Sequence, residues 1–354
     1  MKKIKTFFFS LTLSSALFSS QLCAIDASNT TYGVEVFGEY LYWKVTQDQM
    51  QYAAVLPGGI QPIIDEINSG SEFDICEKII IKEPKFDYIS GFRIGAAYHV
   101  PCTNWDALIA WDHLSEKVSS NVFDPDYGVI PLTLPASSIF EFVNRDADEF
   151  SFGNKATDSW RFDFNTIDIE IGTTFTLMDV FNVRPYCGLK FASIKQKQHT
   201  NYYGFSIDDV PVWIQNLKKN DFDGIGSLFG LCSTWEFMPT VNFTSIVSGC
   251  FLVGKVNVKE TSSIMEASNS VTIKLKDSKK SRMRPMIDAT IGIDWTPNYF
   301  CNVDIDIGIY YEMQYWWNQW QAPTSIQNSL LGGGSSPQGD LMMQGVTLGL
   351  DIAF

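Results

Sequence analysis

Long stretches of this chain alternate apolar and polar side chains with a period of two, and this pattern restricts the fold more than any other feature. In residues 88–100, for example, Phe92 and Tyr98 alternate with Arg93 and His99. Successive side chains of a β-strand point to opposite faces, so each stretch predicts a strand with one apolar and one polar face. Several stretches exceed the roughly ten residues that a tilted strand needs to cross a bilayer, whereas a soluble β-sandwich, the alternative, uses strands of about six.

The pattern predicts an all-β chain with about ten strands. Twelve strands remain open, because residues 50–56, 79–81 and 129–134 are also apolar and could extend neighbouring strands or add a hairpin. The ten predicted strands cover residues 32–44, 88–100, 105–117, 165–177, 183–197, 221–237, 240–258, 283–296, 299–317 and 340–354.

The connections between these strands alternate between short and long. A few residues, often with Pro or Asn, join four pairs of strands, whereas the other five joins are long and polar. Short turns at one end and long loops at the other are typical of a transmembrane antiparallel β-barrel, with periplasmic turns and extracellular loops. The strictly alternating segment Gly345–Phe354, which ends on an aromatic residue, is also typical of such barrels. The predicted loops are 45–87, 118–159, 198–220, 259–282 and 318–339.

The first 24 residues read as a cleaved signal peptide, because three lysines precede an apolar stretch diluted by Ser and Thr. We therefore predict one barrel domain over residues 25–354 and a location in the outer membrane of a Gram-negative-type cell. Cleavage would change the net charge from −14 to −17. This acidity argues against nucleic acid or anionic lipid as the main partner, because both need a basic footprint. Aromatic residues near strand ends predict a girdle at the membrane interfaces: Tyr42, Trp43, Tyr98, Trp105, Trp235, Trp295, Trp316 and Trp317.

The first strand carries the block Leu41-Tyr42-Trp43-Lys44, and a later strand carries Gly91-Phe92-Arg93-Ile94-Gly95. Both segments resemble the Legionella-type pore-forming, or major, outer-membrane proteins, a family that also occurs in chlamydia-like bacteria. The GVTLGLDIAF ending fits this family as well as barrels in general. The resemblance implies a major outer-membrane protein with pore activity, and it supplies no site residues.

Motifs for catalysis or for cofactor binding are missing from the sequence, so we predict neither an enzyme nor a cofactor. Asp112-His113 is the one pair to weigh, since some outer-membrane barrels are proteases. Neighbouring residues on a strand point to opposite faces, so these two side chains cannot cooperate directly.

The polar face of the strands places an excess of carboxylates inside the predicted barrel. Acids and bases could pair across a narrow lumen and plug it, but the bases are too few to neutralise all the acids, which favours a hydrated, cation-preferring interior. The inward candidates are the acids Glu35, Glu39, Asp106, Asp112, Glu116, Asp168, Glu170, Asp288, Asp294, Asp304, Asp306, Glu312 and Asp351 and the bases Arg93, Arg184, Lys190 and Arg284.

Ten strands enclose a narrow lumen, so we predict a narrow diffusion pore for small solutes or cations, surrounded by outer-membrane lipid. The alternative is a non-conducting structural barrel or adhesin that acts through its loops. Loop 45–87 contains enough apolar residues, such as Ile60 and Ile63, to fold inward as a plug.

Six cysteines remain after the signal peptide, and an even number in an oxidising compartment permits disulfides. Most of them could instead act as small apolar residues. The family resemblance implies a second use, because chlamydia-like envelopes crosslink outer-membrane proteins through cysteines. Cys76 in a loop and Cys102 in a turn are then the accessible candidates for disulfide-linked envelope partners or a homo-oligomer.

Overall fold

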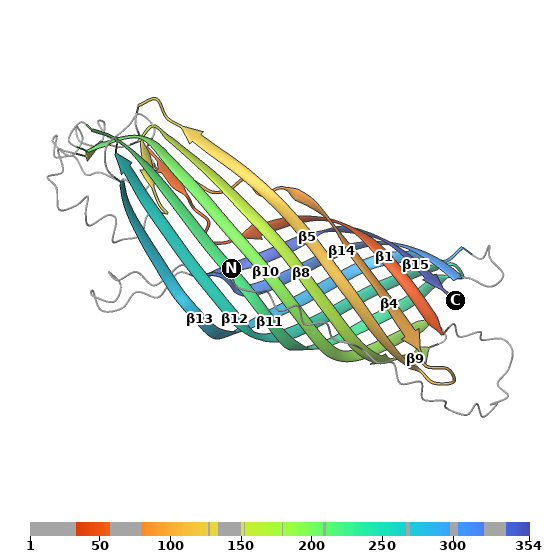
Figure 1. Cartoon of the computed structure of the whole chain (residues 1–354). Coiled ribbons are helices and arrows are strands. Elements are labelled where there is room, and N and C mark those ends of the chain that lie inside the picture. Colours follow the sequence, from red (N-terminus) through yellow and green to blue (C-terminus); the bar gives the residue numbers. More distant parts are fainter. Residues whose placement is uncertain are drawn as a thin grey trace, which may run out of the picture. The chain divides into compact units, whose positions relative to one another are not determined.

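Ten antiparallel strands form a closed barrel, which confirms the predicted fold and strand number (Figure 1). The computed structural model describes residues 33–56, 79–126, 128–133, 150–151, 153–178, 180–207, 210–266, 270–297, 304–321 and 338–354. The barrel strands are β1 (Val34–Gln47), β4 (Tyr88–His99), β5 (Trp105–Phe123), β8 (Lys155–Thr173), β10 (Phe181–Ile207), β11 (Val210–Met238), β12 (Val241–Glu266), β13 (Ser270–Trp295), β14 (Asp304–Gln321) and β15 (Gln338–Ala353).

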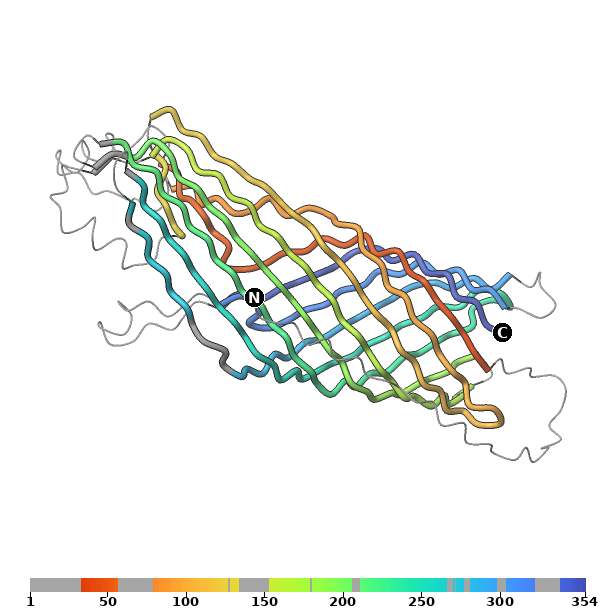
Figure 2. Tube along the Cα trace, in the orientation of Figure 1, coloured from red at the N-terminus to blue at the C-terminus, as the bar shows by residue number. Residues whose placement is uncertain are grey.

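The first and last strands close the ring. β1 and β15 pair from Glu35 opposite Ala353 to Gln47 opposite Leu341, and Figure 2 shows these two ends of the chain side by side in red and blue. Every strand also pairs with its neighbour in the chain, so that the ring has no free edge among its ten strands. A closed ring satisfies the backbone hydrogen bonds that water cannot satisfy inside a bilayer.

The period-two pattern separates an outer apolar face from the barrel interior. On β1, Tyr40 and Tyr42 are 47% and 46% exposed, whereas Leu41 and Trp43, which alternate with them, are fully buried. The other strands alternate in the same way, and their outward apolar side chains form what we call the apolar band, which faces lipid. Among the described residues no helix is long and apolar enough to cross a membrane.

Two predicted loops are wrong in extent, because most of their residues are strand. β10 continues to Ile207 and β11 begins at Val210, so residues 198–207 and 210–220 are paired strands. Residues 259–266 of β12 and 270–282 of β13 extend the next strand pair in the same way. Beyond the membrane the outward side chains become polar, which hides the alternation of hydrophobicity, while backbone pairing continues in water. The described ring shows ten strands rather than twelve.

The loop end of the barrel contains a second, three-stranded sheet, formed by β2 (Ala53–Val55), β3 (Ile80–Lys82) and β6 (Val129–Pro131). Inward side chains of β10 hold the chain segment that enters this sheet. The Gln198 Nε2 donates to the Met50 carbonyl at 3.1 Å, and the Tyr202 hydroxyl donates to the Tyr52 carbonyl. Part of loop 45–87 therefore folds inward, although Ile60 and Ile63 lie outside the described residues. Two short strands, β7 (Phe150–Ser151) and β9 (Phe175–Met178), pair with β10.

Candidate functional site

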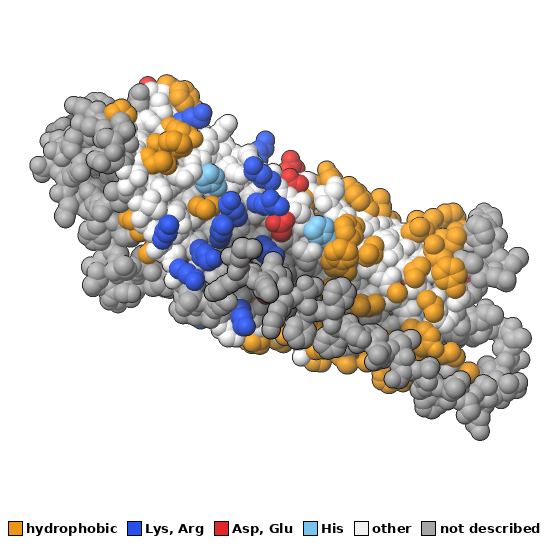
Figure 3. Space-filling view, in the orientation of Figure 1, with side chains coloured by type: hydrophobic (Ala, Val, Ile, Leu, Met, Phe, Trp, Pro, Cys, Tyr) orange, Lys and Arg blue, Asp and Glu red, His pale blue; other side chains and the backbone are white. Residues whose placement is uncertain are grey.

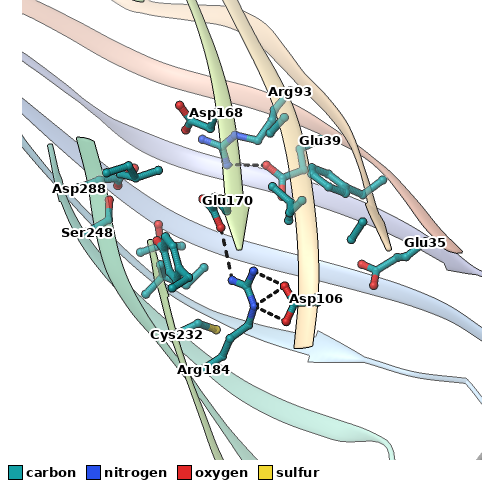
Figure 4. Close-up of a pocket in the computed structure, with 18 of the residues that line it drawn as sticks. Glu35, Glu39, Arg93, Asp106, Asp168, Glu170, Arg184, Cys232, Ser248 and Asp288 are labelled. Carbon is teal, nitrogen blue, oxygen red and sulfur yellow. Dashed lines mark hydrogen bonds and ion pairs between the residues drawn. The ribbon is translucent and has the colours of Figure 1, made fainter. Parts of the chain in front are cut away.

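The turn half of the barrel encloses a charged cavity of about 310 Å³, which we call the chamber (Figure 4). Inward side chains from strands all around the ring line it, because each strand turns its polar face inward in this half. Its charged and polar lining includes Glu35, Glu39, Arg93, His99, Asp106, Asp168, Glu170, Arg184, Asp288 and Glu312.

Arg93 is the centre of the largest ion-pair group in the chamber. Its Nη1 lies 2.7 Å from Glu39 Oε2, its Nε lies 2.7 Å from Asp112 Oδ1, and its Nη2 lies 3.0 Å from Glu312 Oε2. One guanidinium thus joins carboxylates from β1, β5 and β14, three strands that the fold alone brings together. The Arg93 guanidinium also lies 5.8 Å from the ring of Trp43, within cation–π range.

Two further bases from β10 bind carboxylates of the chamber. The Arg184 Nε donates to both carboxylate oxygens of Asp106 at 2.9 Å, and its Nη1 reaches Glu170 at 3.4 Å. The Lys190 Nζ lies 2.6 Å from Asp168 Oδ2. Figure 4 shows Arg184 and Arg93 extending toward the same space from different strands.

Some inward carboxylates have no base within ion-pair distance in the described part of the chain. Asp288 is one of them, and its Oδ1 is buried without a hydrogen-bond partner. At the turn end, Asp306 and Asp351 are direct neighbours across the β14–β15 pair. Like charges at directly opposed positions of neighbouring strands repel each other.

On the loop side of the chamber, the interior is filled by buried apolar side chains that we call the plug layer. Along β1 the inward series passes from Glu35 and Glu39 to Leu41 and Trp43, and along β14 it passes from Glu312 to Trp316. The side chains of the layer are 0–2% exposed. The plug layer comprises Leu41, Trp43, Leu114, Trp160, Phe162, Phe164, Leu252, Met286, Trp316 and Met343.

The predicted aromatic girdle needs a correction at two positions. Trp43 and Trp316 are fully buried in the plug layer, whereas Trp317, the chain neighbour of Trp316, is 37% exposed on the outer face. The Trp43 Nε1 donates to Thr347 Oγ1 at 3.0 Å, and the Trp316 Nε1 donates to Gln314 Oε1 at 3.3 Å. Both indole nitrogens are therefore satisfied inside the barrel, as a buried Trp requires. Tyr42, Tyr98, Trp105, Trp235, Trp295 and Trp317 are exposed, as a girdle requires.

Beyond the plug layer, a second polar group lies under the three-stranded sheet. Asp158 on β8 accepts a hydrogen bond from the Thr200 hydroxyl at 2.7 Å, and Lys218 on β11 lies 3.8 Å from Glu260 on β12. The outward neighbours of Asp158 are Thr157 and Ser159, so this part of β8 lies beyond the apolar band. Burial raises the pKa of Asp158 to about 6. The same cause lowers the pKa of Lys218.

Replacing Asp158 by asparagine should stabilise the barrel more at pH 7.5 than at pH 4. The folded-state pKa of about 6 exceeds the ordinary value of 3.8, so the folded state binds more protons in this interval and its stability falls as the pH rises through it. Packing effects of Asp158→Asn are the same at both pH values. The stabilisation should therefore differ by roughly 2–3 kcal/mol between them, measured by urea unfolding of the refolded barrel. Asp163→Asn, an outward-facing change on the same strand, should show no such difference; an equal effect of Asp158→Asn at both pH values would contradict the prediction.

The structure separates the predicted lumen residues into three places. Most of them line the chamber or bind a residue that does, as Lys190 and Asp112 do. Asp294, Asp306 and Asp351 lie at the turn end of the interior, near the exposed side chain of Asp304. Arg284 is buried on the loop side, with its Nε and Nη2 unpartnered, and half-buried Glu116 also lies there, two residues beyond Leu114 on β5. Asp158, Lys218 and Glu260 were missed, because their segments looked like the edges or interiors of loops.

The Asp112-His113 pair and the cysteines are the remaining candidates. Asp112 points inward to Arg93, and His113 points outward, where its Nδ1 is 2.8 Å from Asn165 Oδ1. Cys102 is an exposed free thiol in the turn between β4 and β5. Cys76 lies outside the described residues, so crosslinking through either cysteine stays a prediction.

Solved outer-membrane proteins match this chain at low sequence identity, and comparison with curated protein sequences gives no match. The outer membrane protease OmpT of Escherichia coli matches with a TM-score of 0.38 and 8% identity over 92% of this chain and 98% of that one. A major outer membrane protein of Thermus thermophilus matches with a TM-score of 0.30 and 11% identity over 91% of this chain and 100% of that one. The CymD monoaromatic hydrocarbon channel matches with a TM-score of 0.31 and 8% identity over 91% of this chain and 89% of that one.

One comparison covers nearly the whole chain at the level of sequence. The family model described as the Legionella pneumophila major outer membrane protein precursor matches residues 27–354. This match includes every described residue and therefore all ten barrel strands, the chamber and the plug layer. The chain thus belongs to the Legionella major outer membrane protein family and is a β-barrel of the outer membrane.

Proposed function

We propose that this barrel is a narrow, cation-preferring diffusion pore without enzymatic activity, and that the plug layer closes it at rest. The surplus of carboxylates in the chamber is the observation that carries the proposal. Eight acids line the chamber or bind a base that does (Glu35, Glu39, Asp106, Asp112, Asp168, Glu170, Asp288 and Glu312), and three strong bases accompany them (Arg93, Arg184 and Lys190). Ion pairing cannot neutralise this surplus, so mobile cations or protons must do so.

The turn end adds to this preference. Asp306 and Asp351 face each other directly, where a hydrated cation would relieve their repulsion. A small cation entering from the turn end thus meets carboxylates first and the ion-paired wall of the chamber next. Anions meet the same charges as a barrier, which is how rings of acids select cations in other pores.

Asp306→Asn combined with Asp351→Asn should reduce the preference for cations over anions without abolishing conduction. The measurement is the reversal potential of the refolded mature barrel in a planar bilayer under a salt gradient. Asp221→Asn combined with Asp223→Asn removes the same charge from the outer wall of β11 and should leave the reversal potential unchanged. Anion preference in the wild type, or equal effects of the two double variants, would overturn the assignment of selectivity to the interior.

A non-conducting structural barrel is the second candidate, and the plug layer favours it. Within the described residues the layer fills the cross-section between the chamber and the three-stranded sheet with side chains of 0–2% exposure. A structural barrel would use its loops, or the Cys102 thiol, to contact envelope or surface partners. It would show no conductance in a bilayer even after large side chains of the plug layer are replaced by smaller ones, which distinguishes it from a closed pore.

A further inference from the structure

Six basic side chains form a row across the outer wall of the barrel, one from each of six consecutive strands. The register places Lys117 directly opposite Arg161, and Arg161 directly opposite Lys197. The same register rows continue through the next three strands. The cation row comprises Lys117, Arg161, Lys197, Lys219, Lys259 and Lys276. All six side chains are exposed, and Figure 3 shows Lys and Arg gathered in a band across the middle of this face, where Figure 1 places β5 to β13.

The cation row is electrostatically unfavourable by itself. Directly opposed side chains on neighbouring strands have Cβ atoms about 5 Å apart, and like charges at such positions destabilise a sheet. Within the described chain, Arg161 has a carboxylate beside it, with its Nε 3.2 Å from Asp163 Oδ2. None of the five lysines has a carboxylate within ion-pair distance among the described residues. Four lysines in adjacent register positions, with Lys117 beyond Arg161, therefore have no ion-pair partner among the described residues, which indicates a surface that binds an anion from outside the chain.

The cation row runs parallel to the edge of the apolar band. The last large apolar residues of the band on these strands are themselves register neighbours: Trp111, Ile167, Phe191, Ile225, Val253 and Met283. The basic residue follows six positions further along each strand, or seven on β13, which is about 20 Å of strand. The outward positions between them are mostly polar or charged, with His113 and Ser115 on β5 and the acids Asp163 on β8 and Asp221 and Asp223 on β11. The row therefore lies outside the hydrocarbon and beside the headgroup side of the outer leaflet.

We propose that the cation row binds the phosphorylated headgroups of a glycolipid in the outer leaflet. The occupant must be anionic, must offer several charges at spacings of a few ångströms, and must lie against the barrel wall rather than above the loop tips. A phosphorylated sugar headgroup meets all three conditions, and lysines near a membrane surface each add to the attraction for anionic lipid. The inference is independent of whether the interior conducts.

The test uses the mature barrel refolded in neutral detergent and titrated with a bis-phosphorylated glycolipid, with bound lipid counted by native mass spectrometry. Lys197→Gln, Lys219→Gln and Lys259→Gln remove the centre of the row. This triple variant should bind the glycolipid at least about tenfold more weakly, because each exposed lysine near anionic lipid contributes measurably to binding. The matched control, Lys44→Gln, Lys85→Gln and Lys155→Gln, removes three cations that lie outside the row and should bind like the wild type.

Further measurements test whether the row recognises the phosphate groups of the lipid, whether free phosphate can replace them, and whether the row stabilises the barrel without lipid. The dephosphorylated glycolipid should bind weakly to every variant, and inorganic phosphate should not compete at concentrations far above those of the lipid. Without lipid, the row variant should unfold no earlier than the wild type, since it loses repulsion and no partner. Equal glycolipid binding by the row and control variants would overturn the proposal. So would equal binding of the two glycolipids, or displacement by inorganic phosphate, which would reduce the row to a general anion surface.

Discussion

Arg93→Met is expected to destabilise the barrel by about 3–5 kcal/mol, the largest loss for any single substitution in the chamber. The change leaves the carboxylates of Glu39, Asp112 and Glu312 close together with no base between them. Removing one partner of a buried ion pair costs far more than the pair contributes, because the remaining charge is desolvated and uncompensated. Urea unfolding of the barrel in lipid vesicles at neutral pH measures the loss.

Second-site changes separate this explanation from a simple loss of packing. Arg93→Met together with Glu39→Gln and Glu312→Gln should recover most of the stability, because two of the three unpaired charges are gone. Arg93→Lys should be intermediate, since an ammonium cannot span three carboxylates in the way a planar guanidinium does. Arg161→Met, on the outer wall, should change the stability by less than about 1 kcal/mol. A full loss in the triple variant would show that Arg93 acts through packing instead.

Thinning the plug layer should turn rare, small conductance steps into frequent and larger ones. The rings of Phe164 and Trp316 meet edge to face with centroids 5.6 Å apart, and both side chains are fully buried. Phe164→Ala with Trp316→Ala removes both rings and opens the cross-section on the loop side of the chamber. Single-channel recording in a planar bilayer measures the steps, and the cation preference should persist because the chamber is unchanged.

The control and a milder variant keep this prediction testable. Trp317→Ala removes an aromatic ring from the outer face of the same strand and should leave the conductance unchanged. Large buried residues replaced by alanine cost about 3–5 kcal/mol each, so the double variant risks unfolding. Phe164→Leu with Trp316→Leu loses less volume and should give a smaller change in the same direction. Silence from both variants in a folded barrel would contradict the pore and favour the structural barrel.

Local pattern sufficed to predict which face each strand turns inward. Glu39, Arg93, Glu312 and the other inward candidates on the ten strands were identified from parity alone, because a strand alternates its faces whatever its partner is. The alternation of faces also indicates that Trp43 and Trp316 point inward, into the plug layer. Their assignment to the aromatic girdle did not take this into account. Tyr40 and Tyr42 point outward, so Trp43 must point inward, and the same argument separates Trp316 from Trp317.

The strand segments that the sequence analysis predicted as loops are those in which the backbone is paired but hydrophobic and polar residues no longer alternate. Within the described residues of 198–220 and 259–282, the outward side chains are mostly polar because these segments extend beyond lipid, and the backbone nevertheless continues as strand. Asp158 and Glu260 are buried at this end of the barrel. Burial in this region depends on a segment around Tyr52 that folds back into the barrel, which no local pattern specifies.

The sequence by itself determined the strand number, the inward faces and the excess of interior acids, because each depends on composition and on a period of two along one strand. The tertiary structure alone decided which residues meet across strands: three carboxylates on Arg93, a plug layer of rings, and six basic side chains in one row. Those contacts depend on the register between strands and on closure of the ring. Register is a property of backbone pairing between distant segments, and a single strand contains no record of it.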